Sequence, residues 1–237
     1  MSDEQRRRYL EAMGITLWVR RGMNPPEPAR SDPVHAAASA AGTDVEHLDL
    51  DTLRGVVAGC RRCDLHRTRT QTVFGVGNPH PEWLIIGEAP GADEDRQGEP
   101  FVGRAGQLLN AMLAAIGLCR EEVYIANILK CRPPQNRDPR PEEVACCEPY
   151  LRRQVALLAP RIILAVGRIA AQNLLAITTP IGKMRGQVYA LGALGVPVVV
   201  TYHPAYLLRS PTEKRKAWQD LVLAQRVYRE ALAKDRR

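Results

Sequence analysis

A run of apolar residues that ends abruptly in a polar loop sets the strongest constraint on how this chain folds. Residues 83–86 are Trp-Leu-Ile-Ile, without the alternation of apolar and polar side chains that a half-exposed strand shows. A continuous apolar strand is typical of a parallel sheet that is covered on both faces. Gly87 and Pro90 then end the run, and a loop that carries Glu88 and Glu94 follows. Because open α/β sheets bind ligands at the carboxyl ends of their strands, we expect a site at this loop.

The order of strand, loop and helix recurs along the chain. Continuous apolar runs at 123–129, 161–167 and 196–201 predict three further buried strands. Residues 108–116 and 141–158 carry apolar side chains at three- and four-residue steps, which is helical spacing. This alternation is typical of an α/β fold with a parallel sheet. The remaining expected elements are a short edge strand at 186–189, a helix capped by Asp49, and a last helix from Pro211 to about Ala233.

Length and composition indicate one main domain. The 237 residues, of which 45% are hydrophobic, can bury one sizeable core. We expect residues 1–47 to form an N-terminal helix and a flexible Pro- and Ala-rich linker, and residues 48–237 to form the domain. No apolar run reaches the roughly 18 residues of a membrane span, and the N-terminus does not resemble a signal peptide. We therefore expect a soluble, cytoplasmic protein without a membrane partner.

The positive charge is concentrated in the predicted domain. The chain carries a formal charge of +7, with 33 Lys and Arg against 26 Asp and Glu. Residues 1–47 hold six of the basic and seven of the acidic residues, so the whole excess lies in residues 48–237. A basic domain suits a polyanion such as nucleic acid, although an Arg-rich solvated surface has the same composition.

The spacing of the cysteines suggests a site with four thiolates. Six cysteines in an intracellular chain favour metal binding or chemistry over a disulfide framework. Cys60 and Cys63 form a C-x2-C pair, and Cys131 ends a predicted strand. Cys147 shares the apolar face of the helix at 141–158, whereas Cys146 is rotated by about 100° and is the fallback ligand. Four thiolates suit either zinc or a [4Fe–4S] cluster, and the spacing alone does not choose between them.

Three predicted strands end in side chains that could form one site. Glu88 and Glu94 follow the first strand, Asn127 ends the second, and His203 follows the last. Parallel strands place their carboxyl ends on one edge of the sheet, so these groups are expected to meet there. An Asn at a strand end or a His before a proline is often structural, and it is the coincidence of all three that favours a site.

Around these residues, the chain from about Cys60 to Leu223 resembles the family 4, iron–sulfur uracil-DNA glycosylases. The resemblance depends on four motifs taken together: G-E-A-P-G at 87–91, E-P-F-V-G-R-A-G at 99–106, N-I-L-K-C-R-P-P-Q-N-R at 127–137 and H-P-A-Y-L-L-R at 203–209. It implies a three-layer α/β/α fold with a central four-stranded parallel sheet. It also implies hydrolysis of the N-glycosidic bond of deoxyuridine in DNA, single- or double-stranded, by a monomer. The resemblance assigns a [4Fe–4S] cluster to Cys60, Cys63, Cys131 and Cys147.

The resemblance also implies roles for the residues at the strand ends, given that a base must be flipped out of the duplex to be reached. Phe101 is expected to stack on the flipped base, and the amide of Asn127 to pair with uracil N3–H and O4. His203 is expected to hydrogen-bond uracil O2 as negative charge develops on the leaving base. Glu88 is assigned to orienting water and Glu94 to excluding the methyl group of thymine, an assignment that could be reversed.

Other positions are assigned to the substrate or to DNA. Ala89 lines the expected pocket where better-known relatives outside this family carry an Asp. Leu207 or Leu208 is expected to fill the space that the base leaves, with Arg209 near a phosphate. A buried Leu is the alternative for either one. Arg104 opens a helix whose N–H groups could hold a phosphate.

Three alternatives to this function remain. A glycosylase of different base specificity is one, although residues 132–140 lack the His with which one related family traps DNA covalently. A second is a non-catalytic iron–sulfur protein that binds DNA or senses damage. A third is a structural domain stabilised by zinc.

Overall fold

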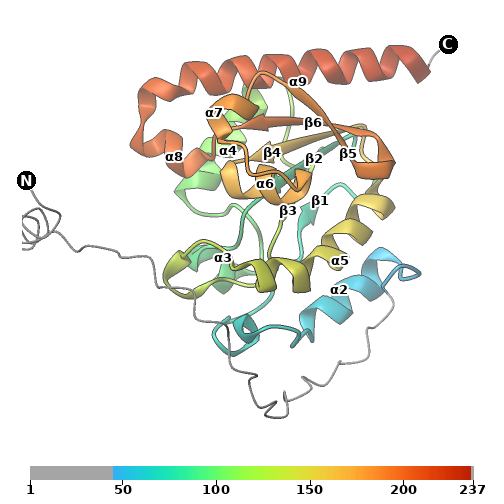
Figure 1. Cartoon of the computed structure of the whole chain (residues 1–237), viewed down its shortest axis with the longest axis vertical. Helices are drawn as coiled ribbons and strands as arrows, with labels where there is room; N and C mark the ends of the chain where they lie inside the picture. The colour runs from blue at the N-terminus through green and yellow to red at the C-terminus, as the bar shows by residue number, and fades with distance from the viewer. Residues whose placement is uncertain (1–44, 236–237) are drawn as a thin grey trace, which may run out of the picture. The chain divides into compact units, whose positions relative to one another are not determined.

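The computed structural model describes residues 45–235 and has a central sheet of six strands in the order β1-β3-β2-β4-β6-β5 (Figure 1). The four inner strands pair in parallel. They are β3 (Tyr124–Asn127), β2 (Trp83–Gly87), β4 (Ile162–Val166) and β6 (Val196–Thr201). This confirms the predicted α/β class and the four-stranded parallel sheet.

Two short antiparallel strands extend the parallel sheet at its edges. The first, β1 (Val76–Gly77), pairs with β3 and was not predicted, because two residues are too few to show a periodicity. The second, β5 (Val188–Leu191), pairs with β6. It is the expected edge strand, but it begins two residues later than the sequence indicated.

Helices cover both faces of the sheet, as expected for three layers. The α-helices in chain order are α2 (Leu50–Ala58), α3 (Ala92–Gln97), α4 (Arg104–Ala115), α5 (Pro141–Leu158), α6 (Arg168–Leu175), α7 (Ile181–Met184), α8 (Pro204–Arg209) and α9 (Lys214–Asp235). Short 3-10 helices lie at Asp64–Arg67, Pro134–Asn136, Gly192–Leu194 and Pro211–Glu213. The expected last helix is therefore divided into a 3-10 turn and α9.

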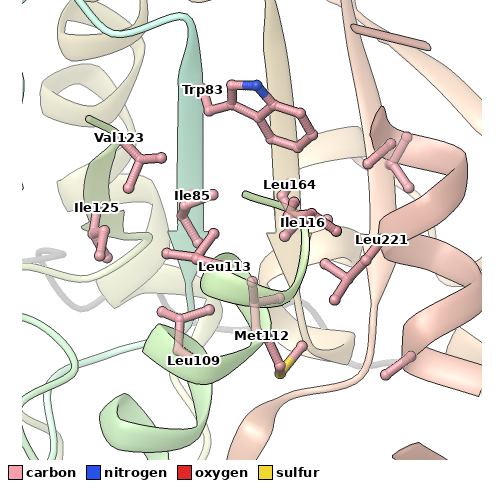
Figure 2. Close-up of a cluster of buried hydrophobic side chains, with 14 of the residues drawn as sticks. Trp83, Ile85, Leu109, Met112, Leu113, Ile116, Val123, Ile125, Leu164 and Leu221 are labelled. Atoms are coloured by element: carbon pink, nitrogen blue, oxygen red, sulfur yellow. The ribbon is translucent and has the colours of Figure 1, made fainter. Parts of the chain in front are cut away.

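Successive side chains of β2 point into two different cores. Ile85 lies in a cluster with side chains of α4 and α9, among them Leu113 and Leu221, and Figure 2 shows these side chains around the strand. Leu84 and Ile86 lie in a second cluster with side chains of α5 and α6. Because both faces of the strand are covered, both must be apolar, which explains the continuous run in the sequence.

The start of the described chain is already packed. Val45 is buried in a cluster that includes Leu53 and Tyr150. The side chain of Asp49 accepts a hydrogen bond from the N–H of Thr52 at 2.8 Å, which confirms that Asp49 caps α2. The predicted helix and linker within residues 1–44 lie outside the described residues, and the boundary at residue 47 stays a prediction. Within residues 45–235, no helix combines the length and the apolar character that crossing a bilayer requires.

Candidate active site

The carboxyl ends of β2 and β3 lie side by side and bring the first site residues together. Gly87 ends β2 and is in register with Asn127, which ends β3. A Cβ atom at Gly87 would collide with the Asn127 side-chain oxygen and would lie 2.6 Å from Cε2 of Phe101. The amide of Asn127 and the ring of Phe101 therefore meet over a backbone position that only glycine can occupy.

The side chain of Asn127 is buried and incompletely paired. It is 2% exposed, and its Oδ1 has no hydrogen-bond partner within residues 45–235. A buried amide oxygen without a donor costs about 1–3 kcal/mol. Its backbone oxygen, in contrast, accepts a hydrogen bond from the buried Nζ of Lys130 at 2.8 Å. The backbone of Asn127 is thus fixed while its amide is available to a ligand N–H group.

Phe101 is held in an unusual backbone conformation beside Asn127. Its φ angle is +55°, and its buried ring stacks on the ring of His203 with a centroid distance of 5.5 Å. Arg120 donates hydrogen bonds to the backbone oxygens of Pro100 at 2.6 Å and of Phe101 at 3.3 Å. Phe101 also belongs to a core cluster, so its ring contributes to packing as well as to the site. Sequence reasoning missed Arg120, because its partners lie about twenty positions earlier and no local pattern links them.

His203 is a neutral hydrogen-bond donor in this arrangement. Its Nδ1 accepts a hydrogen bond from the N–H of Ala205 at 3.1 Å, so the neutral ring carries its proton on Nε2. Burial, and then the charge of Arg209, lower the pKa of His203 to about 4. The ring is therefore uncharged near neutral pH and presents an N–H group.

The two carboxylates of the first loop differ in their contacts. Glu94 accepts hydrogen bonds from the N–H groups of Val102 and Gly103 at 3.0 and 3.2 Å, and from that of Gly91 at 3.1 Å. It therefore joins the loop after β2 to the loop that carries Phe101. The Glu88 carboxylate has no hydrogen bond to the described residues.

The electrostatic surroundings of Glu88 are also distinctive. Burial, and to a smaller extent the carboxylate of Asp138, raise its pKa to about 7, while the charge of Arg168 opposes this shift. A half-buried carboxylate whose pKa lies near neutrality is a common feature of sites that act on protons or water. Neither Asp138 nor Arg168 was singled out from the sequence.

The loop around α8 divides the predicted DNA-contacting residues into exposed and buried ones. Leu208 is 37% exposed and Arg209 is exposed, whereas Leu207 is 1% exposed and packs in a core cluster. Of the two leucines offered as alternatives for insertion into DNA, Leu207 therefore fills the core and Leu208 is the one available at the surface. Arg104 is exposed at the start of α4, as expected.

Ala89 lies between the candidate site and the cysteines. It packs against a cluster that contains Cys131 and Cys147. Its predicted place in the substrate pocket stays a prediction. The loop after β2 therefore joins the candidate active site to the cysteine cluster.

The cysteines gather from three segments of the chain. Cys131 and Cys147 are buried together, and Cys63 packs against them. Burial and the neighbouring thiols, including those of Cys131 and Cys60, raise the pKa of Cys63 to about 11. Tyr150 donates a hydrogen bond to Sγ of Cys60 at 3.3 Å. In the described part of the chain, however, no group of three or more His, Cys, Asp or Glu side chains is arranged to hold a metal ion.

Cationic side chains lie next to these sulfur atoms. Nη1 of Arg69 donates to Sγ of Cys131 at 3.0 Å, and its Nη2 donates to the backbone oxygen of Cys60 at 2.8 Å. Burial lowers the pKa of the neighbouring Lys130 to about 7, and the thiols of Cys147 and Cys131 oppose this shift. This donor set, four thiols with the guanidinium of Arg69 beside them, fits an anionic thiolate-bound group. Of the two remaining cysteines, Cys119 is exposed. Cys146 lies beside the C-x2-C pair: it donates to the backbone oxygen of Arg62 at 3.2 Å, and its thiol also raises the pKa of Cys63.

Comparison with known proteins agrees with this site. Residues 74–222 match the family model of the uracil DNA glycosylase superfamily. A type-4 uracil-DNA glycosylase from Archaeoglobus fulgidus is 52% identical over 168 residues, which cover 68% of this chain and 84% of that protein. A type-4 uracil-DNA glycosylase from Thermotoga maritima is 45% identical over 65% of this chain and 80% of that protein. One from Pyrobaculum aerophilum is 42% identical over 74% of this chain and 93% of that protein. The matched region contains the strand ends with Glu88, Asn127 and His203, and the chain belongs to the type-4 uracil-DNA glycosylases of the uracil DNA glycosylase superfamily.

Proposed function

We propose that this protein is a DNA repair enzyme that flips uracil out of DNA and hydrolyses its N-glycosidic bond, leaving an abasic site. The observation that carries the proposal is the buried, unpaired amide oxygen of Asn127, which lies beside the Phe101 ring with the neutral His203 stacked on that ring. Relatives that align with this chain over most of their own length are named type-4 uracil-DNA glycosylases.

Asn127 is proposed to read the base. Its Oδ1 accepts from uracil N3–H, and its amide N–H donates to uracil O4. Cytosine offers an acceptor at N3 and a donor at N4, so both pairs would be mismatched in the pocket. The hydrogen bond from Lys130 to the backbone oxygen of Asn127 supports this role because it fixes the position from which the side chain extends. Phe101 is proposed to provide the surface on which the base stacks.

His203 is proposed to stabilise the leaving base. As the glycosidic bond breaks, negative charge develops on uracil O2, and the Nε2–H group donates a hydrogen bond to it. A neutral donor is sufficient, since the uracil anion need not be protonated fully. The hydrogen bond from Ala205 to Nδ1 supports this tautomer.

Glu88 is proposed to orient the attacking water and to stabilise positive charge on the sugar. Both tasks require the carboxylate form, which is populated as the pH rises through about 7. Glu94 is proposed to keep the two loops together and, through them, to shape the side of the pocket that excludes a methyl group. Its three hydrogen bonds to backbone N–H groups support the bracing role.

The proposed DNA surface comprises Arg104, Leu208 and Arg209. Leu208 would enter the space that the flipped base leaves, and the two arginines would contact phosphates. Binding by such groups weakens as salt increases, because neutralised phosphates release counterions. We propose that the enzyme acts as a cytoplasmic monomer on uracil in single- or double-stranded DNA.

A [4Fe–4S] cluster is proposed to be held by Cys60, Cys63, Cys131 and Cys147. Cys131 and Cys147 are buried together with Cys63 against them, and the thiol of Cys60 acts on Cys63, which supports a group held by all four thiolates. When bound, the cluster would join three separate segments, and hydrolysis requires no electron from it. Iron and sulfide analysis after anaerobic purification, with zinc measured on the same sample, tests this assignment.

The function is tested by release of free uracil from single- and double-stranded oligonucleotides that contain one deoxyuridine. Matched oligonucleotides with cytosine or thymine at the same position are the controls. We expect release from the uracil substrates only, with an alkali-labile abasic site left in the strand. DNA binding without any uracil release would exclude the glycosylase and favour a non-catalytic DNA-binding protein.

A further inference from the structure

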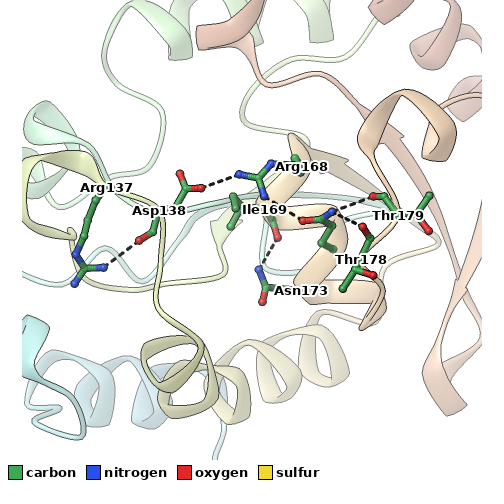
Figure 3. A network of polar contacts seen from close by, with 8 residues as sticks. Arg137, Asp138, Arg168, Ile169, Asn173, Thr178 and Thr179 are labelled. Carbon is green, nitrogen blue, oxygen red and sulfur yellow. Dashed lines mark hydrogen bonds and ion pairs between the residues drawn. The ribbon is translucent and has the colours of Figure 1, made fainter. Parts of the chain in front are cut away.

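An ion pair connects the two loops that flank Glu88. In the sheet, β2 lies between β3 and β4, so Glu88 at the end of β2 has the loop after β3 on one side and the start of α6 on the other. Asp138 lies in the first of these segments, and Arg168 is the first residue of α6. Nη2 of Arg168 and Oδ2 of Asp138 are 2.7 Å apart. A dashed line in Figure 3 marks this ion pair.

Each member of the pair is anchored to its own side of the site. On one side, Arg137 donates to the backbone oxygen of Asp138 at 3.0 Å and forms an ion pair with Glu143, on the first turn of α5, at 2.5 Å. On the other side, Arg168 donates to the side chain of Gln172 at 3.3 Å. The Gln172 amide then donates to the backbone oxygens of Thr178 and Thr179 at 3.1 and 3.0 Å (Figure 3). The pair therefore links the start of α5 to the turn after α6.

Stability does not explain this arrangement. The Arg168 and Asp138 side chains are 49% and 65% exposed, and exposed ion pairs contribute about 0–1 kcal/mol. The two groups are, however, the charges that act on Glu88 within the described chain. The other titratable groups of the site, His203 from α8 and Glu94 from α3, are respectively neutral near pH 7 and bound to backbone N–H groups.

We propose that Asp138 and Arg168 are positioning residues that seat the loop after β3 beside Glu88 and set the charge around its carboxylate. This inference rests on the proposed glycosylase mechanism, in which Glu88 acts as the carboxylate next to water. The two residues have opposite effects: Asp138 favours the protonated form of Glu88, and Arg168 favours the ionised form. Of the two, Asp138 has the larger effect.

The opposite effects of the two charges on Glu88 distinguish an electrostatic role of the ion pair from a mechanical one. A pair that served only as a mechanical clamp would be broken equally by neutralising either partner. An electrostatic role predicts different outcomes, because removing Asp138's charge lowers the pKa of Glu88 and removing Arg168's charge raises it. The exposure of both side chains means that neither substitution should unfold the protein.

The experiment is the pH profile of uracil release in single turnover, between about pH 5 and pH 9, for wild type, Asp138→Asn and Arg168→Gln. We expect the acid limb to move to lower pH in Asp138→Asn and to higher pH in Arg168→Gln, by about half a pH unit each. The acid limb of the double variant should lie between the limbs of the two single variants. Arg152→Gln is the matched control, because it breaks an exposed ion pair on α5 with Glu148 and should leave the limb in place.

Three results would overturn the inference. Limbs that move in the same direction, or not at all, would leave the pair as a clamp without influence on Glu88. A limb that persists in Glu88→Gln would show that another group titrates. Weaker DNA binding by Arg168→Gln with an unmoved limb would make Arg168 a phosphate contact instead. Should wild type release no uracil, the proposed function fails, whereas normal release with unmoved limbs refutes only this inference.

Discussion

The Nδ1 atom of His203 accepts a hydrogen bond from the backbone N–H of Ala205 at 3.1 Å. Through this bond, the backbone at the start of α8 determines which nitrogen of His203 carries the proton. It fixes the tautomer, so the Nε2–H group is available to a leaving base, and the low pKa keeps the ring from becoming a charged acid near neutral pH. Four expected outcomes at the active site and one at the cysteines depend on contacts of this kind.

Replacing His203 by Ala removes the donor to uracil O2. Loss of one such donor typically lowers a rate by about 10²–10³-fold, so we expect at least a hundredfold lower single-turnover rate of uracil release. His203→Gln, whose amide can still donate a hydrogen bond, should retain more activity than His203→Ala. Equal rates for wild type and His203→Ala would remove His203 from the mechanism.

Replacing Asn127 by Asp removes the donor to uracil O4 and adds a negative charge beside an anionic leaving base. Each unpaired polar group in the closed pocket costs about 1–3 kcal/mol, so uracil excision should fall steeply. The same variant can accept from cytosine N4, and weak cytosine excision is the expected gain. Both activities are measured in single turnover on oligonucleotides that differ only in the target base. A wild-type rate on uracil would show that Asn127 does not read the base.

Glu88 should lower the stability of the folded protein above neutral pH. Burial raises its folded-state pKa from the ordinary 4.5 to about 7, so the stabilising contribution of the neutral form is complete below about pH 4.5 and is lost as the pH rises through about 7. Glu88→Gln does not titrate and should therefore melt at a higher temperature than wild type at about pH 8, but not at about pH 4. A difference of 1 kcal/mol corresponds to about 2–4 °C in a domain of this size. Identical melting curves at both pH values would contradict the shifted pKa.

The same variant has a second expected effect, on the pH dependence of catalysis. In wild type, the single-turnover rate should rise as the pH increases through about 7, because the carboxylate form is the active one. Glu88→Gln should be slow at every pH and lack this limb. Glu94→Gln serves as the comparison, since Glu94 is bound to three backbone N–H groups. If Glu94→Gln proved the more damaging of the two, the roles assigned to the two residues would have to be exchanged.

Cys147 and Cys146 provide a matched pair of neighbours on α5. Cys147 is buried with Cys131, whereas Cys146 points to the backbone oxygen of Arg62. We expect Cys147→Ala to lose iron and thermal stability together, and Cys146→Ala to keep both close to wild type. Iron content and melting temperature are measured on anaerobically purified protein. The reverse result would show that Cys146 is the fourth ligand.

The sequence by itself determined the sheet and the residues at its edge. Continuous apolar runs can be buried on both faces only in a covered parallel sheet, so 83–86, 123–129, 161–167 and 196–201 were each recognisable as inner strands. Because parallel strands end on one edge, the meeting of Glu88, Asn127 and His203 followed from their positions. Helical periodicity likewise placed Cys147 on the buried side of α5, and the capping preference of Asp placed Asp49 at the start of α2.

Only the tertiary structure decided which of two neighbouring side chains is buried and which residues from separate segments form contacts. Leu207 and Leu208 are identical side chains one position apart, and packing against the core buries the first and leaves the second exposed. The backbone oxygens that Arg120 binds lie about twenty positions away, and Asp138, the ion-pair partner of Arg168, lies thirty positions away, beyond the reach of any local pattern. Periodicity reports which face of an element is apolar, because that depends on spacing along one segment. Ion pairs and carbonyl contacts depend on where separate segments end after packing, and that is determined by the assembled fold.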